Sequence, residues 1–162
     1  MKFIILIQAD RNLLKSAALD EMEYLQVLLL NENMIKSCEG INQPLLSTLE
    51  LRKNKIKAIH FDYPLTLLKT LDLSYNLIKC IKGLDFDSLE SLYLAGNQIS
   101  NLTGIQVLFN LKKLHLRGNP IAELNNFSEK FTKLKYLNLR SCKIDSMEEF
   151  KNLKVDYIFD YI

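Results

Sequence analysis

Apolar residues recur along the chain at fixed offsets from an asparagine. In the stretch LKKLHLRGNPI, residues 111–121, leucines stand eight, five and three positions before Asn119, and Ile121 follows it by two. The positions between them are mixed or polar, which predicts a short strand with one buried face. The pattern occurs seven times, and each copy is anchored by one residue: Asn12, Asn33, Asn54, Asn76, Asn97, Asn119 and Cys142.

The anchors are 21, 21, 22, 21, 22 and 23 residues apart, a period that is typical of leucine-rich repeats. One strand cannot bury its apolar face alone, so we predict that the copies stack as a parallel ladder with strands about 4.8 Å apart. The predicted fold class is α/β: a leucine-rich repeat solenoid, or horseshoe, of about seven repeats of 21–23 residues. Strands should line the concave face, and short helical turns should form the convex face.

The anchor asparagines are predicted to point inward. There the amide can bond backbone groups of its own turn and of the next copy, which no strand or helix satisfies. Loss of one such side chain should therefore cost roughly 1–3 kcal/mol. Cys142 occupies the same position in the seventh copy.

The repeats account for nearly all of the 162 residues, so we predict a single domain over 1–162. The first and last copies lack the polar caps that end copies normally carry, which suggests that a further segment or a partner covers them. The longer sixth return, 125–133, is expected to hold a full helical turn. The segment 151–162 is expected to begin an eighth strand.

Composition narrows the classes of partner. A net charge of +2 favours neither nucleic acid nor an acidic membrane, and the N-terminal run MKFIILIQA is too short for a secretory signal. Three cysteines without a CxxC pair indicate a reduced interior and argue against zinc. Cys38 and Cys142 are predicted to be buried, and Cys80 partly exposed. We expect no metal, cofactor or small-molecule substrate.

Residues six, four and two positions before each anchor should face outward on the concave side. They change from apolar in the first copies to acidic and hydroxyl-bearing in the middle, then to basic and aromatic at the end. Exposed apolar clusters tend to mark contact sites, and the basic end suits an acidic protein surface. The alternative is that the side chains of these columns are simply exposed to solvent and differ between copies without binding a partner. The candidate protein-binding residues are Leu6, Val27, Leu29, Glu50, Asp72, Tyr93, Lys113, His115, Arg117, Tyr136 and Arg140.

No catalytic residues are predicted. The repeat geometry places no serine or cysteine nucleophile beside His60 or His115. Glu50 and Asp72 should lie on adjacent strands, but acidic neighbours on an exposed surface are far commoner than catalytic pairs. The basic run 52–57 is interpreted as structural, because two of its members belong to the repeat pattern and its lysines point to different sides.

The repeat pattern LxxLxLxxNxIxxI, with short segments that return from one strand to the next, resembles the phosphatase-regulator-like class of leucine-rich repeats. LIQADRNLLKSA, LLSTLELRKNKI, LESLYLAGNQI and LKKLHLRGNPIAELNNFSEKFTKLKYLNLRSCKI are similar to the leucine-rich-repeat family of ciliary radial spokes. This resemblance covers almost the whole chain. It implies a non-catalytic structural subunit of the axoneme, in the cytoplasm and cytoskeleton of the cilium, that binds other radial spoke subunits and supports ciliary motility.

Two other functions remain open from the sequence. The wider repeat class implies a soluble regulatory subunit that holds a protein phosphatase, or a similar enzyme, in its concave face. A secreted recognition module would instead carry glycans on its two sequons, at Asn101 and Asn126.

Overall fold

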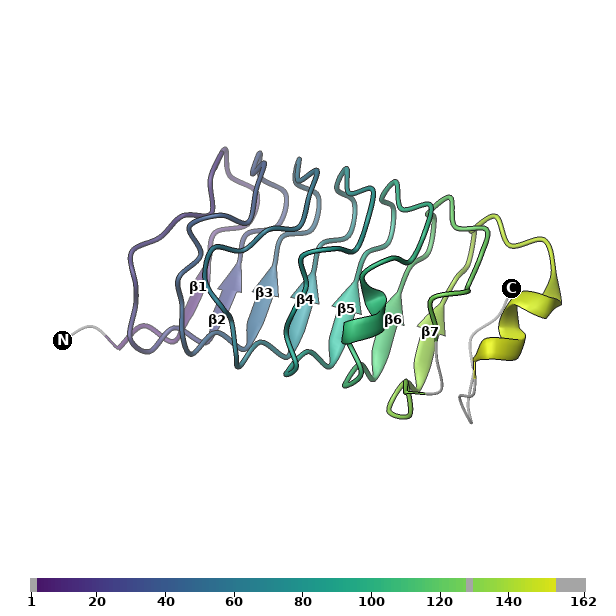
Figure 1. Ribbon diagram of the computed structural model, residues 1–162. Helices are drawn as coiled ribbons and strands as arrows, with labels where there is room; N and C mark the ends of the chain where they lie inside the picture. The colour runs from purple at the N-terminus through teal and green to yellow at the C-terminus, as the bar shows by residue number, and fades with distance from the viewer. Residues whose placement is uncertain (1–2, 128–129, 154–162) are drawn as a thin grey trace.

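The computed structural model describes residues 3–127 and 130–153. Within them, seven short strands pair in parallel in chain order and form one sheet. Figure 1 shows the strands side by side along a rod, with the return paths stacked in the same order. The predicted leucine-rich repeat solenoid is confirmed. The strands are β1 (Leu6–Gln8), β2 (Val27–Leu29), β3 (Thr48–Glu50), β4 (Thr70–Asp72), β5 (Ser91–Tyr93), β6 (Lys113–His115) and β7 (Tyr136–Asn138).

The register of the strands follows the spacing of the repeats. Each strand residue pairs with the equivalent residue of the next copy, so that Leu49 lies beside Leu71 and Leu71 beside Leu92. These central residues are fully buried, while the residues on either side of them are partly exposed. Burial of one such leucine contributes roughly 1.5–3 kcal/mol, so this register is the one that keeps every central leucine out of water.

The anchor asparagines point inward, as predicted. The Asn97 Nδ2 donates to the carbonyl oxygen of Leu94 in its own copy and to that of Leu73 in the preceding copy, each at 3.0 Å. Its Oδ1 accepts the backbone N–H of Ile78, also in the preceding copy, at 3.0 Å. We had expected the amide to bond the next copy, and this prediction was wrong because the bonds are made to the preceding copy. The same three contacts recur at Asn33, Asn54, Asn76 and Asn119.

The first and last anchors differ from the other five. Asn12 is exposed, and its Nδ2 donates to the carbonyl oxygens of Ala9 and Asp10 in its own turn, at 3.1 Å each. Cys142 is half-buried rather than buried, with its Sγ 3.5 Å from the carbonyl oxygen of Leu116. A thiol is a weak donor and carries no amide oxygen, so this copy lacks the strong acceptor that an asparagine would supply.

The residue before each anchor adopts a left-handed backbone conformation in all seven copies. The φ angles run from 54° at Lys53 to 70° at Gly118. This conformation turns the N–H toward the next copy, as where the Gly96 N–H donates to the carbonyl oxygen of Arg117 at 2.7 Å. A Cβ on Gly96 would lie 2.6 Å from Tyr75 Cδ1, whereas one on Gly118 would have its nearest atoms 3.8 Å away.

The return paths contain short helical turns rather than long helices, as predicted. Among the described residues they include two 3-10 helices, η1 (Ile105–Val107) and η2 (Met147–Asn152). Lys151 belongs to η2, so the predicted eighth strand does not begin there. The rest of that predicted strand, 154–162, lies outside the described residues, as do residues 128 and 129 of the sixth return. The predicted helical turn of that return falls partly on them.

The three cysteines are free. Cys38 is buried as predicted, and burial raises the pKa of its thiol to about 12. Cys80 is partly exposed, also as predicted. Burial raises the pKa of the Cys142 thiol as well, against the opposing effect of the backbone N–H groups of Asn119, Ile121 and Gly118. Neither Cys38 nor Cys142 is therefore a ready thiolate at neutral pH.

Candidate protein-binding surface

The outward side chains of the seven strands, together with the residue two before each anchor, form one surface that we call the strand face. It corresponds to the predicted concave face. Strand pairing places the predicted columns in register, as where Tyr93 lies beside His115 and Ser91 beside Lys113. The candidate residues therefore lie on one surface, graded along the solenoid in the predicted order.

The first copies make the strand face apolar. Leu6 is 52% exposed, and Val27 and Leu29 on β2 are half-buried beside it. Phe3 and Ile5, just before β1, are also exposed, and the Phe3 ring packs against Tyr24 with centroids 4.9 Å apart. This cluster offers apolar area to a contact.

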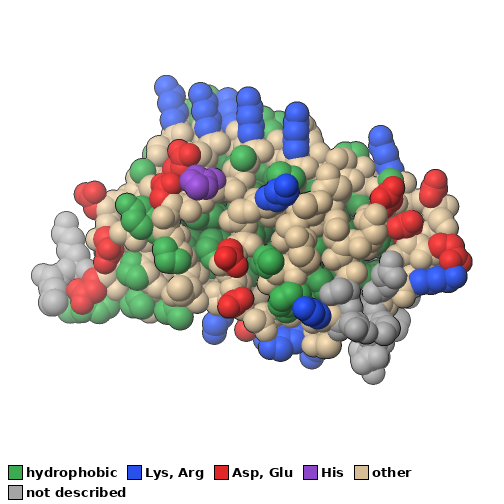
Figure 2. All heavy atoms as spheres, in the orientation of Figure 1, with side chains coloured by type: hydrophobic (Ala, Val, Ile, Leu, Met, Phe, Trp, Pro, Cys, Tyr) green, Lys and Arg blue, Asp and Glu red, His purple; other side chains and the backbone are tan. Residues whose placement is uncertain are grey.

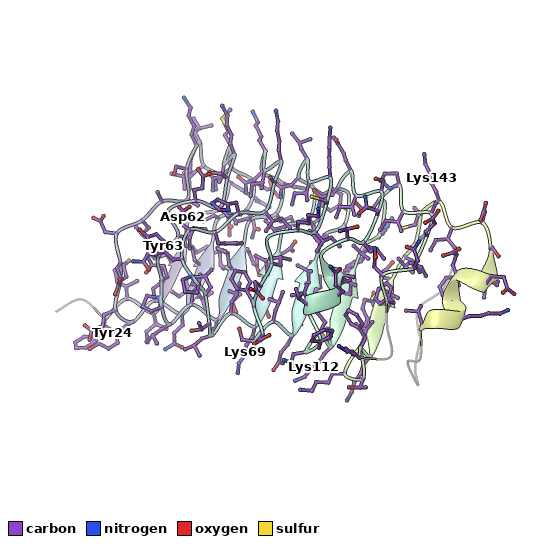
Figure 3. All side chains as sticks on the ribbon, in the orientation of Figure 1. Tyr24, Asp62, Tyr63, Lys69, Lys112 and Lys143 are labelled. Atoms are coloured by element: carbon purple, nitrogen blue, oxygen red, sulfur yellow. The ribbon has the colours of Figure 1, made fainter. Side chains whose placement is uncertain are left out.

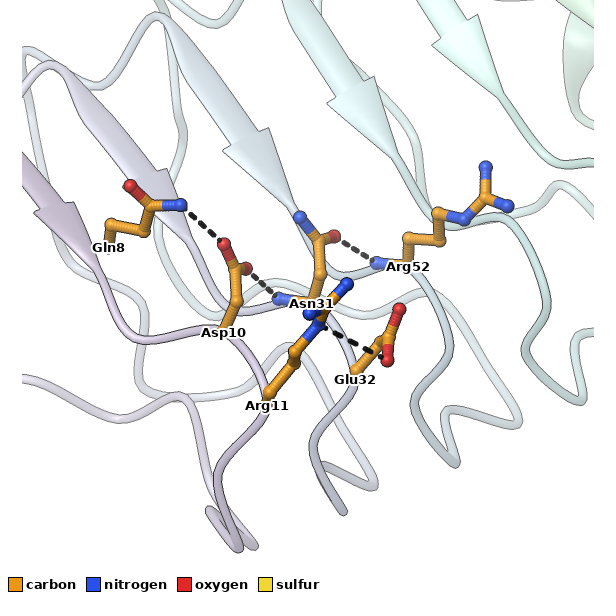
Figure 4. Close-up of a pocket in the computed structure, with 6 residues that line it drawn as sticks. All are labelled: Gln8, Asp10, Arg11, Asn31, Glu32 and Arg52. Atoms are coloured by element: carbon orange, nitrogen blue, oxygen red, sulfur yellow. Dashed lines mark hydrogen bonds and ion pairs between the residues drawn. The ribbon is translucent and has the colours of Figure 1, made fainter.

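Next to it, polar side chains form a continuous hydrogen-bonded chain (Figure 4). The Gln8 Nε2 donates to Asp10 Oδ2 at 2.9 Å, and Asp10 Oδ1 accepts the backbone N–H of Asn31 at 2.6 Å. The Asn31 Nδ2 donates in turn to Glu50 Oε2 at 2.7 Å, and its Oδ1 accepts the backbone N–H of Arg52 at 2.9 Å. Except for Glu50, these residues border an open recess of about 560 Å³, together with Arg11 and Glu32. Its polar groups already bond to one another, which makes it a polar rim rather than a ligand pocket.

Glu50 and Asp72 lie side by side on β3 and β4. Each carboxylate accepts from a separate donor, Glu50 from Asn31 Nδ2 at 2.7 Å and Asp72 from the backbone N–H of Ser74 at 2.8 Å. The two side chains thus serve as hydrogen-bonded acceptors in the middle of the strand face.

Rings gather at the far end of the strand face. Tyr93 and Tyr136 approach the His115 ring edge-on, with centroids 6.1 and 6.2 Å away. The Asn138 Nδ2 donates to the Tyr136 hydroxyl at 3.1 Å, which holds that ring in place. Edge-to-face pairs of this kind add roughly 0.5–1.5 kcal/mol beyond their burial, so the cluster is a fixed feature of β5, β6 and β7.

His115 contributes a ring rather than a charge to this end. Burial lowers the pKa of its imidazole, and nearby Arg117 and Arg52 lower it further, against the opposing effect of Asp72. The imidazole is therefore neutral at pH 7. Its Nε2 is buried and, among the described residues, has no hydrogen-bond partner.

The positive charge of this end comes from Lys113, Arg117 and Arg140, all exposed. Within the part of the chain that the structure describes, none of the three forms an ion pair. The sequence analysis did not name Arg52 as a candidate, although Arg52 stands two positions before Asn54 and so belongs to one of the predicted columns. Arg52 stacks on the Tyr75 ring, 4.6 Å from its centroid. Tyr75 directly precedes its anchor, a position that the three predicted columns leave out.

A family model described as leucine-rich repeats (two copies) matches residues 66–106 and 109–152. This chain belongs to the leucine-rich repeat family. Among the residues that the structure describes, no helix has the length and apolar character needed to span a membrane. Nor do those residues contain a group of three or more His, Cys, Asp or Glu side chains that could hold a metal ion.

This leucine-rich repeat chain is also similar to named proteins. It is 37% identical over 153 residues to leucine-rich repeat-containing protein 23 of Bos taurus. The aligned region covers 93% of this chain and 45% of that protein. It is 32% identical over 146 residues to a protein phosphatase 1 regulatory inhibitor subunit homologue of Arabidopsis thaliana, covering 82% of the chain and 44% of that protein. The chain thus spans less than half the length of either relative.

A solved structure supports the fold. Internalin C2 of Listeria monocytogenes superposes with a TM-score of 0.65 at 21% sequence identity, over 96% of this chain and 80% of that one. At this identity the likeness concerns the fold alone. The family match and the named relatives, rather than this structure, make the chain a leucine-rich repeat domain of the protein-interaction type.

Proposed function

We propose that this chain is a non-catalytic structural subunit of the ciliary axoneme, located in the radial spoke, and that its strand face binds a neighbouring spoke subunit. The 37% identity to leucine-rich repeat-containing protein 23 over 93% of the chain supports this assignment. So does the resemblance of its repeat stretches to the radial spoke family. The proposal concerns the strand face, because that face carries the side chains that the repeat fold does not need.

The observation that carries the proposal is the basic aromatic end of the strand face. Lys113, Arg117 and Arg140 are exposed without ion pairs among the described residues, around the rings of His115 and Tyr136. Tyrosine and arginine are enriched where protein interfaces derive most of their binding energy. An acidic partner surface would neutralise the three cations.

The test is retention in the axoneme. The protein is tagged in its own cell, the membranes are stripped with detergent, and crosslinking mass spectrometry identifies what remains attached. We expect the native protein to stay bound and to crosslink to radial spoke subunits. The double variant Arg117→Glu/Arg140→Glu should wash out while keeping its circular dichroism spectrum.

The matched control is Lys69→Glu/Lys135→Glu, which makes the same change in net charge off the strand face. Both lysines are exposed, and each directly precedes a strand. Retention of the control together with loss of the arginine variant supports the basic aromatic end as the contact. Full retention of the arginine variant would remove that contact from the proposal.

The alternative function is a regulatory subunit that binds a protein phosphatase through the strand face. The similarity to the Arabidopsis phosphatase 1 regulatory subunit homologue favours it. The same experiment separates the two functions: a protein that washes out of the stripped axoneme, and crosslinks to a phosphatase, would replace the spoke assignment with the regulatory one.

A further inference from the structure

Four lysines form a row on the edge of the solenoid that follows the anchors. Each stands three residues after the anchor of one of the first four copies, at Lys15, Lys36, Lys57 and Lys79, and all are exposed. The equivalent residues of the next copies are Ser100, Ala122 and Asp145, so the row ends after the fourth copy. In Figure 2, upright blue side chains line the upper edge over the first half of the rod.

Backbone hydrogen bonds set the register of this lysine row. The N–H of Lys55 donates to the carbonyl oxygen of Ile35 at 2.8 Å, and that of Leu77 to the carbonyl oxygen of Ile56 at 2.8 Å. Each accepting residue directly precedes a lysine of the row. Equivalent residues are therefore about 4.8 Å apart, and four of them span roughly 14 Å. Neighbouring charges in the row lie within one Debye length of about 8–10 Å.

The charge of the row is not neutralised by the protein. Among the described residues, none of its four lysines forms an ion pair or a side-chain hydrogen bond. Other stacked cations in the same chain are neutralised: the Lys112 Nζ lies 2.8 Å from Glu90 Oε2. Glu32 likewise lies between Arg11 and Lys53, at 3.6 and 3.0 Å. Unlike these cations, the four lysines of the row have no carboxylate partner among the described residues.

We propose that the lysine row binds an extended acidic peptide segment of a protein partner. An extended chain rises about 3.3 Å per residue, so the row matches a run of four or five residues. Two exposed leucines flank the row, Leu13 at 80% and Leu77 at 37%. They stand one residue after their anchors and two before a lysine, and so add apolar area beside the charges for the partner's own apolar side chains.

The neighbourhood of the row favours a narrow partner. Glu39 and Asp62 are exposed, and Asp62 lies just below the upper edge in Figure 3. Asp62 is fixed there, because its Oδ2 accepts the Gly40 N–H at 2.9 Å and its Oδ1 lies 3.3 Å from His60 Nε2. A bilayer or a nucleic acid duplex is wide enough to press against these carboxylates. A single peptide chain can follow the lysines alone.

This site is independent of the proposed function, because the row lies outside the strand face. The probe that tests it is a fluorescently labelled hexaglutamate peptide, titrated with the full chain at low ionic strength and followed by fluorescence anisotropy. We expect Lys36→Glu/Lys57→Glu to weaken binding about tenfold or more, since it removes two central contacts and adds two repulsive ones. Added salt should weaken binding of the native chain.

The control Lys69→Glu/Lys135→Glu changes the net charge equally on the opposite edge, where Figure 3 places Lys69. It should weaken binding less than about twofold. Circular dichroism checks that both variants fold, and Lys36→Gln/Lys57→Gln replaces the charge reversal if it unfolds the chain. An equal loss in both variants, or no binding by the native chain, overturns the proposal. Tighter binding of an oligothymidylate, or of phosphatidylserine vesicles, overturns the assignment to a peptide.

Discussion

The anchor ladder makes a quantitative prediction for Asn97→Ala. The substitution removes the acceptor of the Ile78 N–H, and Ile78 is fully buried. An orphaned buried donor costs roughly 1–3 kcal/mol. The carbonyl oxygens of Leu73 and Leu94 lose one donor each but keep another, from Asn76 at 3.0 Å and from Asn119 at 2.9 Å. Each lost bond therefore removes only about 0.5–1.5 kcal/mol, and the three terms together predict a loss of about 2–6 kcal/mol.

Two measurements check this value. Urea unfolding followed by circular dichroism should show a lower midpoint at an unchanged slope. Hydrogen exchange should become faster at the Ile78 amide and stay protected at the Ile56 amide, whose acceptor is Asn76. Asn12→Ala is the control, because Asn12 is exposed and bonds its own turn. It should cost less than about 1 kcal/mol. Equal small losses for the two variants would refute the ladder argument.

Three further predictions concern single positions. Cys142→Asn should raise the free energy of unfolding by about 1 kcal/mol, because the new amide oxygen can accept the Ile121 N–H, and a loss of stability in urea would contradict it. Gly96→Ala and Gly118→Ala both place a Cβ on a left-handed backbone, but calorimetry should show the larger drop in melting temperature for Gly96→Ala, which alone meets a ring at 2.6 Å. Because the pKa of His115 is lowered from 6.5 in the folded state, the unfolded state binds more protons just below that pH. The contribution of His115 to stability is therefore present above pH 6.5 and is lost as the pH falls through the lowered pKa. We expect the urea midpoint of the native chain to decrease over this pH range, and the midpoint of His115→Gln to decrease less.

Much of the strand face could be predicted because a parallel ladder repeats each offset once per copy. Tyr93 and His115 stand four residues before their anchors, and this shared offset was enough to place them side by side. The chemistry of His115 was less predictable. The columns placed His115 at the basic and aromatic end of the face, but burial lowers the pKa of its imidazole.

For the lysine row too, the positions could be predicted from the sequence but the electrostatic environment could not. The run 52–57 was interpreted along the chain, where its lysines point to different sides, and so its membership in a column across copies was missed. Lys53 pairs with Glu32, whereas Lys57 joins the uncompensated row. Arithmetic on the repeat can place these lysines in columns. Whether a column is neutralised depends on which carboxylate of a neighbouring copy reaches it.

The sequence by itself determined the period, the parallel order and the outward columns, because one register buries the central leucine of each strand from β2 to β7. The tertiary structure decided the interactions that cross between copies. It placed the anchor amide against the preceding copy, which explains why Asn12 and Asn97 differ despite identical positions in the repeat. It also decided which charges are paired. These outcomes depend on distances between side chains that lie some twenty residues apart, which a periodic pattern does not contain.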